Sequence, residues 1–443
     1  MGFGQGLSGL NAASQNLDVI GNNIANSSTV GFKASTIAFA DVYASSRVGL
    51  GVQVANINQR FTTGNISVSG NQLDMAIDGA KGLFRLVDNN GAVYYSRNGQ
   101  FTANKNFDVV NAQGQKLTGF KANPDGTITN ELTTIKVPVG NIAPQATTTV
   151  SLRTNLDSRS EEIQGVSDGY SAITNPDGTT SYRPTFDVTK PENHTHTLPM
   201  TVYDSLGNPH QLNQYFVKVA ENDGNSEWEV YYALDGELLH GTDGNASLED
   251  PTASSKLIKK TLSFDAAGRL VNADNPDLPP QDFNLTVSGM GGASPADPLA
   301  IEISYNGSTQ FGGEFSPSFA QNGFTTGEYS SMSIASDGTI VANYTNGESQ
   351  IMGALALADF NNMNGLQAVG GNAWVETGAS GQPVLGQPGT NGFASVKGQA
   401  VEESNVDMSQ ELVNMIIAQR TYQANAQTIK TQDQILQTLI TLR

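Results

Sequence analysis

Two glycine-containing patterns in the sequence are typical of cofactor or catalytic sites. Residues 4–9 (GQGLSG) have the G-x-G-x-x-G spacing of a dinucleotide-binding turn, but that turn must follow a strand, and none is predicted there. Residues 165–169 (GVSDG) have the spacing of a nucleophile elbow, which requires a sharp strand-to-helix turn in an α/β sheet. Ser167 lies instead in a polar, loop-rich stretch. The sequence therefore favours a flexible N-terminus and a surface turn over a cofactor site and a catalytic serine.

Histidines are the next candidates for chemistry, because imidazole binds transition metals. His194 and His196 would lie on one face of a strand, and His210 follows nearby. No cysteine or carboxylate completes a recognisable ligand set around them. None of the Asp-Gly and Asn-Gly pairs fits the pattern of a calcium-binding loop with its closing glutamate. We therefore expect exposed or core-rim histidines, no catalytic residue, no cofactor and no metal, and a structural or assembly protein rather than an enzyme.

Composition narrows the class of protein further. The chain has 443 residues, enough for roughly two to four domains, and its hydrophobic content of 38% is sufficient for real cores. With 23 Lys+Arg against 42 Asp+Glu, the net charge of -19 argues against a nucleic-acid partner, which requires a basic face. The chain contains no cysteine, so disulfides, thiolate metal sites and cysteine nucleophiles are excluded together.

Membrane and targeting signals are also missing from the sequence. Residues 1–10 contain neither a basic n-region nor an unbroken apolar h-region, so they do not resemble a cleavable secretory signal. No stretch approaches the roughly 20 apolar residues that span a bilayer. We expect no membrane insertion, and either a soluble protein or export by a route without such a signal.

Both chain ends are predicted to be helical, because apolar residues recur there at helical spacing. The stripe near the start comprises Leu7, Leu10, Leu17, Ile20 and Ile24, and the stripe near the end comprises Leu412, Met415, Ile416, Tyr422, Ile429, Leu436 and Leu439. Helices are predicted over 6–26 and 406–441, the second capped by Ser404 or Asn405. Each stripe needs a partner, either the other end of the same chain or neighbouring copies, as in a coiled coil.

Almost everything between the two helices has the pattern of strands and turns. Hairpin signals run from 73 to 139, and similar signals return from 324 to 398, which predicts one β-domain assembled from both flanks. Residues 147–321 predict an inserted all-β domain. The predicted fold class is therefore mixed and mainly β: N- and C-terminal helices form a coiled-coil-like inner domain, and antiparallel β-domains are nested between them.

Long motifs at the two ends resemble a known family. Residues 9–13 (GLNAA), 17–26 (LDVIGNNIAN) and 29–33 (TVGFK) resemble the N-terminal signature of bacterial flagellar axial proteins, the rod and hook group. Residues 403–407 (ESNVD), 411–413 (ELV) and 418–425 (AQRTYQAN) resemble their C-terminal signature. The residues carried over from these motifs are Asn22, Asn23, Ala25, Asn26, Gly31, Phe32, Lys33, Asn405, Val406, Asp407, Gln419 and Arg420.

The middle of the chain resembles the hook branch of this family rather than the shorter distal rod proteins. Residues 84–88 (FRLVD), residues 95–101 (YSRNGQF) and the large insertion carry that resemblance. It implies a curved hollow helical tube that acts as a universal joint, in which terminal helices line the channel, the β-domain forms the wall and the insertion lies outside. A distal rod or hook-associated axial protein and, less favoured, a secreted β-rich adhesin are the alternatives.

The resemblance also implies boundaries and partners. We expect terminal helices in 1–29 and 402–443, an extended connector in 30–70 and 399–401, a wall β-domain in 71–146 and 324–398, and an outer β-domain in 147–323. The implied partners are further copies of the chain, the distal rod, hook cap and hook-filament junction proteins, and the flagellar type III export apparatus. The implied location is the extracellular hook of the flagellum, reached without a cleaved signal peptide.

Overall fold

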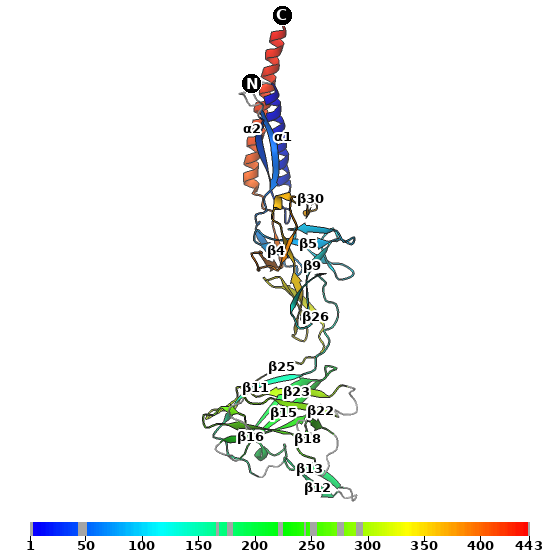
Figure 1. Cartoon of the computed structure of the whole chain (residues 1–443), viewed down its shortest axis with the longest axis vertical. Coiled ribbons are helices and arrows are strands. Elements are labelled where there is room, and N and C mark those ends of the chain that lie inside the picture. Colours follow the sequence, from blue (N-terminus) through cyan, green and yellow to red (C-terminus); the bar gives the residue numbers. More distant parts are fainter. Residues whose placement is uncertain are drawn as a thin grey trace. The chain divides into compact units, whose positions relative to one another are not determined.

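The computed structural model describes residues 3–42, 51–164, 168–174, 180–219, 225–242, 245–248, 255–272, 279–288 and 296–441. The chain forms two compact units (Figure 1). The first comprises Met1–Gly140, Tyr329–Tyr344 and Ser349–Arg443, and the second comprises Asn141–Glu328 and Thr345–Glu348. The predicted fold class, mainly β with a helix at each chain end, is confirmed. Among the described residues, no helix is both long enough and apolar enough to cross a membrane.

The two terminal helices pack against each other in the first unit. Helix α1 spans Phe3–Ala25 and helix α2 spans Met408–Thr441. They are antiparallel, since Gly6 lies against Ile429 and Gly9 against Asn425. The N-cap of α2 is Asp407, whose Oδ1 accepts hydrogen bonds from the backbone N–H groups of residues 409 and 410 at 2.9 and 3.1 Å. The expectation of a cap at residue 404 or 405 is therefore wrong.

A long hairpin follows α1 where the sequence predicts an extended connector. Strands β1 (Ser35–Val42) and β2 (Gly51–Gln59) pair antiparallel, and both contact α1. Asn23 attaches the hairpin to the helix: its Nδ2 donates to the Ser35 carbonyl at 2.8 Å and its Oδ1 accepts from the Ser35 N–H at 2.9 Å. Much of the segment 30–70 is thus folded against the helix rather than extended alone.

The β-part of the first unit is built from both flanks of the chain. The main path of its large sheet is β26 (Tyr329–Ile334), β27 (Thr339–Tyr344), β28 (Ser349–Leu355), β9 (Lys116–Ala122), β5 (Leu83–Val87), β6 (Val93–Ser96), β31 (Ala373–Val375) and β30 (Gln367–Gly370). Side strands are β7 (Thr102–Ala103), β8 (Val109–Val110), β10 (Ile128–Thr134), β29 (Leu357–Asp359) and β32 (Val384–Gly386). Separate pairs are β3 (Ile66–Val68) with β34 (Ala400–Glu402) and β4 (Met75–Asp78) with β33 (Ser395–Gly398), and a short 3-10 helix spans Met363–Gly365. The core of this part contains Phe84, Phe101 and Leu355.

The second unit contains two larger sheets. One consists of β18 (His240–Thr242), β19 (Asn245–Ser247), β22 (Phe283–Ser288), β23 (Leu299–Ser304), β11 (Thr149–Asp157), β24 (Thr309–Phe311) and β25 (Ser316–Gln321). The other consists of β14 (His196–Tyr203), β15 (Pro209–Lys218), β16 (Ser226–Leu234), β17 (Glu237–Leu238), β20 (Lys259–Phe264) and β21 (Leu270–Val271). A hairpin joins β12 (Tyr170–Thr174) to β13 (Thr180–Pro184), and a 3-10 helix spans Pro191–Asn193. Most pairs are antiparallel as predicted, but β11 pairs parallel with β23 and β24, and β19 with β22. Side chains from both sheets form one core around Trp228.

The histidines serve the packing of this second unit. The ring of His196 stacks on Phe315 with centroids 4.4 Å apart, and it lies nearly parallel to Trp228 at 6.1 Å. Burial lowers the pKa of His196, and the Asp157 carboxylate opposes that shift. His210 Nδ1 lies 2.7 Å from Asp235 Oδ2. The core-rim interpretation therefore describes these residues, whereas residues 165–167, which include Ser167, lie outside the described residues.

Candidate assembly surface and the junction that positions it

Two of the three glycines in residues 4–9, Gly6 and Gly9, are part of a helix-helix contact. They lie within α1, not in a flexible terminus, so that expectation is wrong. A Cβ on Gly6 would lie 3.2 Å from Ile429 Cγ1, and a Cβ on Gly9 would lie 2.8 Å from Asn425 Oδ1. Because glycine has no Cβ, the two helix backbones approach closely at Gly6 and Gly9, whereas a Cβ on Gly4 would meet nothing within 4 Å.

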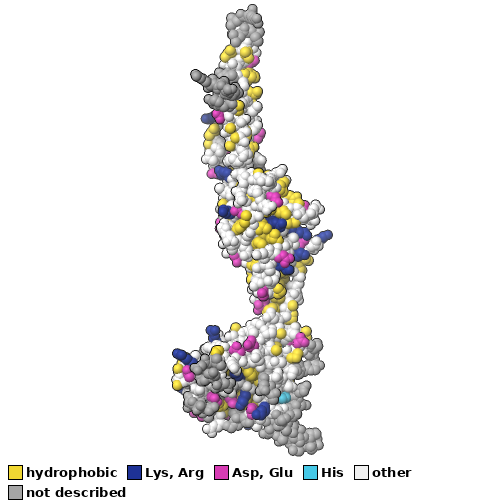
Figure 2. Space-filling model, viewed as in Figure 1, with side chains coloured by type: hydrophobic (Ala, Val, Ile, Leu, Met, Phe, Trp, Pro, Cys, Tyr) yellow, Lys and Arg dark blue, Asp and Glu magenta, His cyan; other side chains and the backbone are white. Residues whose placement is uncertain are grey.

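Large apolar residues of the two stripes are only partly covered by the chain itself. Of those predicted from helical spacing, Ile20 is buried, whereas Leu10, Leu17, Ile24, Met415 and Ile429 are half-buried. The exposed members are Leu7, Leu412, Ile416, Tyr422 and Leu436, and the side chain of Leu439 lies outside the described residues. Further exposed apolar residues on the helices are Phe3, Met408, Val413, Ile417 and Ile435. Figure 2 shows hydrophobic side chains along the visible face of the helix pair.

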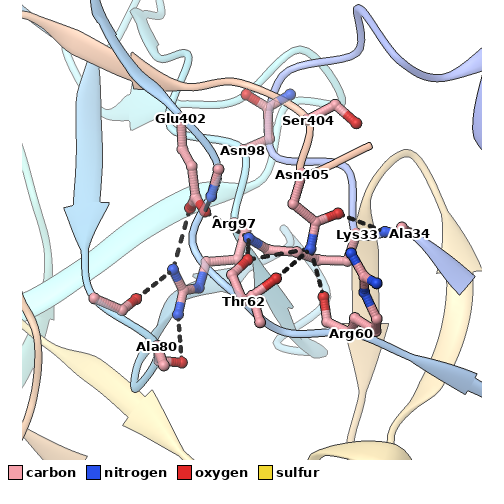
Figure 3. A network of polar contacts seen from close by, with 12 residues as sticks. Lys33, Ala34, Arg60, Thr62, Ala80, Arg97, Asn98, Glu402, Ser404 and Asn405 are labelled. Carbon is pink, nitrogen blue, oxygen red and sulfur yellow. Dashed lines mark hydrogen bonds and ion pairs between the residues drawn. The ribbon is translucent and has the colours of Figure 1, made fainter. Parts of the chain in front are cut away.

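A buried cluster of charges lies where the helix pair joins the β-part of the first unit (Figure 3). Glu402 Oε1 accepts from Lys33 Nζ at 2.5 Å and from the Gly64 N–H at 2.9 Å, and Glu402 Oε2 accepts from Arg97 Nη1 at 3.1 Å. All three charged side chains are fully shielded from solvent. We call Lys33, Arg97 and Glu402 the junction triad; it links the segment after α1, the loop after β6 and the strand before α2.

Backbone carbonyls accept further hydrogen bonds from the two triad cations. Lys33 Nζ donates to the Thr62 carbonyl at 2.7 Å. Arg97 donates from Nη1 to the Gly79 carbonyl at 3.0 Å and from Nη2 to the Ala80 carbonyl at 2.7 Å, while its Nε has no hydrogen-bond partner. The triad carries two positive charges and one negative charge. Burial lowers the pKa of Lys33; Glu402 opposes this shift and Arg97 adds to it. Burial likewise lowers the pKa of Arg97.

Asn405 fixes the chain just before α2. Its Oδ1 accepts from the Ala34 N–H at 2.7 Å, and its Nδ2 donates to the Arg60 carbonyl at 2.7 Å and to Thr62 Oγ1 at 2.9 Å (Figure 3). Because these bonds occupy its side chain, Asn405 cannot cap the helix. The same amide therefore joins the segments that follow α1, follow β2 and precede α2.

The turn after α1 explains several other motif residues. Asn26 Nδ2 donates to Asn22 Oδ1 at 2.7 Å, and Asn26 Oδ1 accepts from Thr29 Oγ1 at 3.1 Å, so these side chains shape the helix end that follows Ala25. Gly31 has φ +71°, and a Cβ there would lie 2.5 Å from the backbone N of Asn98. The turn thus requires glycine at this position.

Four further motif residues have more peripheral positions. The Phe32 carbonyl accepts weakly from the Asn405 N–H at 3.5 Å, and the Val406 N–H donates to Ser404 Oγ at 3.3 Å. Gln419 and Arg420 are exposed on α2. The structure therefore brings Lys33 and Asn405 together in one junction, but it does not bring Gln419 or Arg420 to it.

Sequence reasoning missed two members of the triad. Arg97 lies in the quoted YSRNGQF segment, and Glu402 directly precedes the C-terminal motif, yet neither is among the predicted site residues. A usable signal was present in Ala400-Val401-Glu402, where one acid ends a short apolar strand. An acid in such a place is buried only when a cation meets it.

The site defines a class of protein before any comparison is made. Two terminal helices are joined to the β-part by a buried polar junction, and they leave large apolar side chains uncovered. No cluster of His, Asp and Glu side chains that could hold a metal occurs among the described residues. These features are typical of a structural subunit that assembles with other chains.

Comparisons with known proteins identify the family. Family models match residues 5–33 (flagella basal body rod protein), 76–154 (flagellar hook protein FlgE/F/G D1 domain), 171–324 (flagellar basal body protein FlaE D2 domain) and 397–442 (flagellar basal body rod FlgEFG protein C-terminal). The flagellar hook protein FlgE of Escherichia coli is 42% identical and that of Salmonella typhimurium 43% identical, each over 100% of both chains. The FlgE of Treponema pallidum is 30% identical over 99% of this chain and 98% of its own.

A solved structure supports the same fold. The crystal structure of Helicobacter pylori flagellar hook protein FlgE2 aligns with a TM-score of 0.53 and 14% identity, covering 76% of this chain and 100% of that one. The chain belongs to the flagellar hook protein FlgE family, and it is a structural subunit of the bacterial flagellar hook.

Proposed function

We propose that this subunit polymerises through its terminal helices into a curved hollow tube, which transmits motor torque to the filament as a universal joint and performs no enzymatic reaction. One observation carries the proposal: the helix pair leaves large apolar residues such as Leu412 and Ile416 uncovered. Ile416 is 52% exposed, so completing its burial in a neighbouring copy is worth roughly 1 kcal/mol. Repeated over many copies, such contacts favour the polymer.

The proposal assigns a place in the tube to each segment. The helices of 1–29 and 402–443 line the channel, and 30–70 with 399–401 connect them to the wall. Residues 71–146 and 324–398 form the wall, and 147–323 form an outer domain. The paired strands β3 and β34 support the assignment of 30–70 and 399–401 to one connector, because they join residues 66–68 to residues 400–402. Limited proteolysis of assembled tubes tests the scheme: cleavage should begin within 147–323, and first cleavage within 408–441 would contradict it.

Family membership supports a proposal for further partners. The subunit would contact distal rod, hook cap and hook-filament junction proteins, and the flagellar type III apparatus would export it without a cleaved signal peptide. Intact-mass measurement of hooks sheared from cells tests the export route. A mass that lacks an N-terminal segment would contradict it.

Electron microscopy of concentrated subunit tests the central claim. The unsubstituted chain should form curved hollow tubes, whereas Ile416→Glu should raise the concentration needed for assembly by at least about tenfold, the equivalent of 1.4 kcal/mol. Gln427→Glu is the matched control, because it places the same charge at another exposed position of α2. Equal assembly by both variants would show that the uncovered apolar residues do not drive polymerisation.

A further inference from the structure

The face of α2 that lies against α1 forms a regular seam. We define the seam as the residues spaced alternately by four and three along this face: Glu411, Met415, Ala418, Tyr422, Asn425, Ile429 and Gln432. Ala418 is buried, and contacts with Gly9 and Gly6 place Asn425 and Ile429 against α1. This is the a/d spacing of a coiled coil, in which each seam residue packs between side chains of the partner helix.

The seam continues beyond the end of its partner. Because Gly6 lies against Ile429 in an antiparallel pair, Phe3, the first described residue of α1, lies opposite Gln432. Residues 433–441 of α2 extend past it as an overhang of about 13 Å (Figure 1). Leu436 and Leu439 occupy the next two seam positions by spacing. Leu436 is 47% exposed, so the described residues leave about half of this seam leucine uncovered.

A hollow with a mixed polar and apolar lining lies at the opposite end of the same helix pair. It has a volume of about 260 Å³, and α1 (Val19, Ile20), β1 (Ile37, Phe39) and α2 (Ile417) supply its apolar lining. Phe39 and Ile417 are 45% and 57% exposed at this site. One water needs only roughly 10–15 Å³ of such volume, so the hollow has room for a side chain. Glu411 is the charged residue among its described lining.

We propose that the overhang of one subunit seats in this hollow of a second copy, with Leu436 entering between α1, β1 and α2. The inference rests on the proposed polymerisation and names the contact that propagates it. The two surfaces lie at opposite ends of one helix pair, so each copy offers a free overhang and a free hollow. Such a head-to-tail contact continues without closing and generates a filament. It also buries the exposed part of Leu436 by extending the α1–α2 interface from one copy to the next.

Cysteine cross-linking tests the contact cleanly, because the chain has no cysteine of its own. Subunits carrying both Leu436→Cys and Ile417→Cys should give a ladder of covalent multimers when assembled tubes are oxidised, since disulfides require Cα atoms within about 7 Å. Control subunits carry Leu436→Cys together with Val68→Cys, which is an exposed position on β3. These subunits should stay monomeric on a denaturing gel. Tubes that form normally but give no 436–417 ladder would overturn the contact and leave polymerisation standing.

Adjacent point variants separate the seam from general exposure. Leu436 and Ile435 have side chains of equal size, and they are 47% and 49% exposed, but only Leu436 continues the seam. Leu436→Asn should raise the concentration needed for assembly at least tenfold, and Ile435→Asn less than threefold. Equal effects would overturn the role of the seam. Failure of the unsubstituted chain to form tubes would overturn the proposed function itself, which makes the two failures distinguishable.

Discussion

Substituting Glu402 should strongly destabilise the first unit. Glu402→Gln keeps the shape of the side chain but removes the only negative charge of the junction triad, so Lys33 and Arg97 remain buried as two uncompensated cations. Breaking a buried ion pair by removing one partner costs about 3–5 kcal/mol. The loss of two charge-assisted hydrogen bonds at about 1.5–3 kcal/mol each leads to the same range.

Glu403→Gln is the matched control for this substitution. Glu403 is the next residue, it is exposed, and its Oε2 accepts from Asn65 Nδ2 at 3.0 Å. An exposed interaction of this kind is worth about 0–1 kcal/mol. The measurement is urea unfolding of the subunit in a Trp228→Phe background, where Trp374 is the single remaining tryptophan. Trp374 reports on the junction region, because its Nε1 donates to Gln59 Oε1 at 2.7 Å and its ring packs on Phe61.

The effect of Glu402→Gln should also depend on pH in a defined direction. Burial already lowers the pKa of Lys33, and the substitution removes the Glu402 charge that opposes this shift. The folded state then releases the Lys33 proton before the unfolded state does, so the unfolded state binds more protons and stability rises with pH. The deficit of Glu402→Gln should therefore shrink toward alkaline pH. Free energies of unfolding within about 0.5 kcal/mol of Glu403→Gln, or a deficit that grows with pH, would refute the reasoning.

Two further predictions concern a turn and a histidine. Gly31→Ala should cost more than about 3 kcal/mol, because a positive φ of 71° combines with a Cβ 2.5 Å from a backbone nitrogen, whereas Gly91→Ala, with φ +86° and open space, should cost about 1–2 kcal/mol; similar unfolding midpoints would contradict this. Burial lowers the pKa of His196, so the unfolded state binds more protons and the second unit should lose stability as pH falls below about 6.5. His196→Phe should flatten that pH dependence in urea unfolding followed by Trp228 fluorescence in a Trp374→Phe background, and an unchanged slope would exclude His196 as its source.

The sequence predicts local elements well and long-range contacts poorly. Helical spacing predicts helices over 6–26 and 406–441, and the structure has α1 at Phe3–Ala25 and α2 at Met408–Thr441. The apolar run 351–360 has the pattern of one buried strand, but the chain divides it between β28 and β29, which have different partners. Periodicity records burial of a segment, and it carries no information about where that segment changes neighbours.

Local patterns could not show which residues pair in the junction triad. Glu402 meets Lys33 across 369 residues and Arg97 across 305 residues of sequence, so no spacing rule connects them. The motif resemblance pointed to Lys33 without supplying a physical reason for it. That reason is visible only in the fold, where the lysine is buried and therefore requires the carboxylate.

Buried charges and uncovered apolar side chains serve two different purposes in the helix pair. At the junction, the triad and Asn405 satisfy buried polar groups with bonds between segments distant in sequence, so the segments next to both helices are joined within one chain. Along the helices and at the overhang, large apolar groups remain uncovered, so their burial requires other copies. A polar network demands one geometry, because each misplaced group loses its partner, whereas apolar contacts tolerate small displacements. In the proposed curved tube, each subunit must hold its own segments together and yet adjust to its neighbours, and this distribution of contacts meets both requirements.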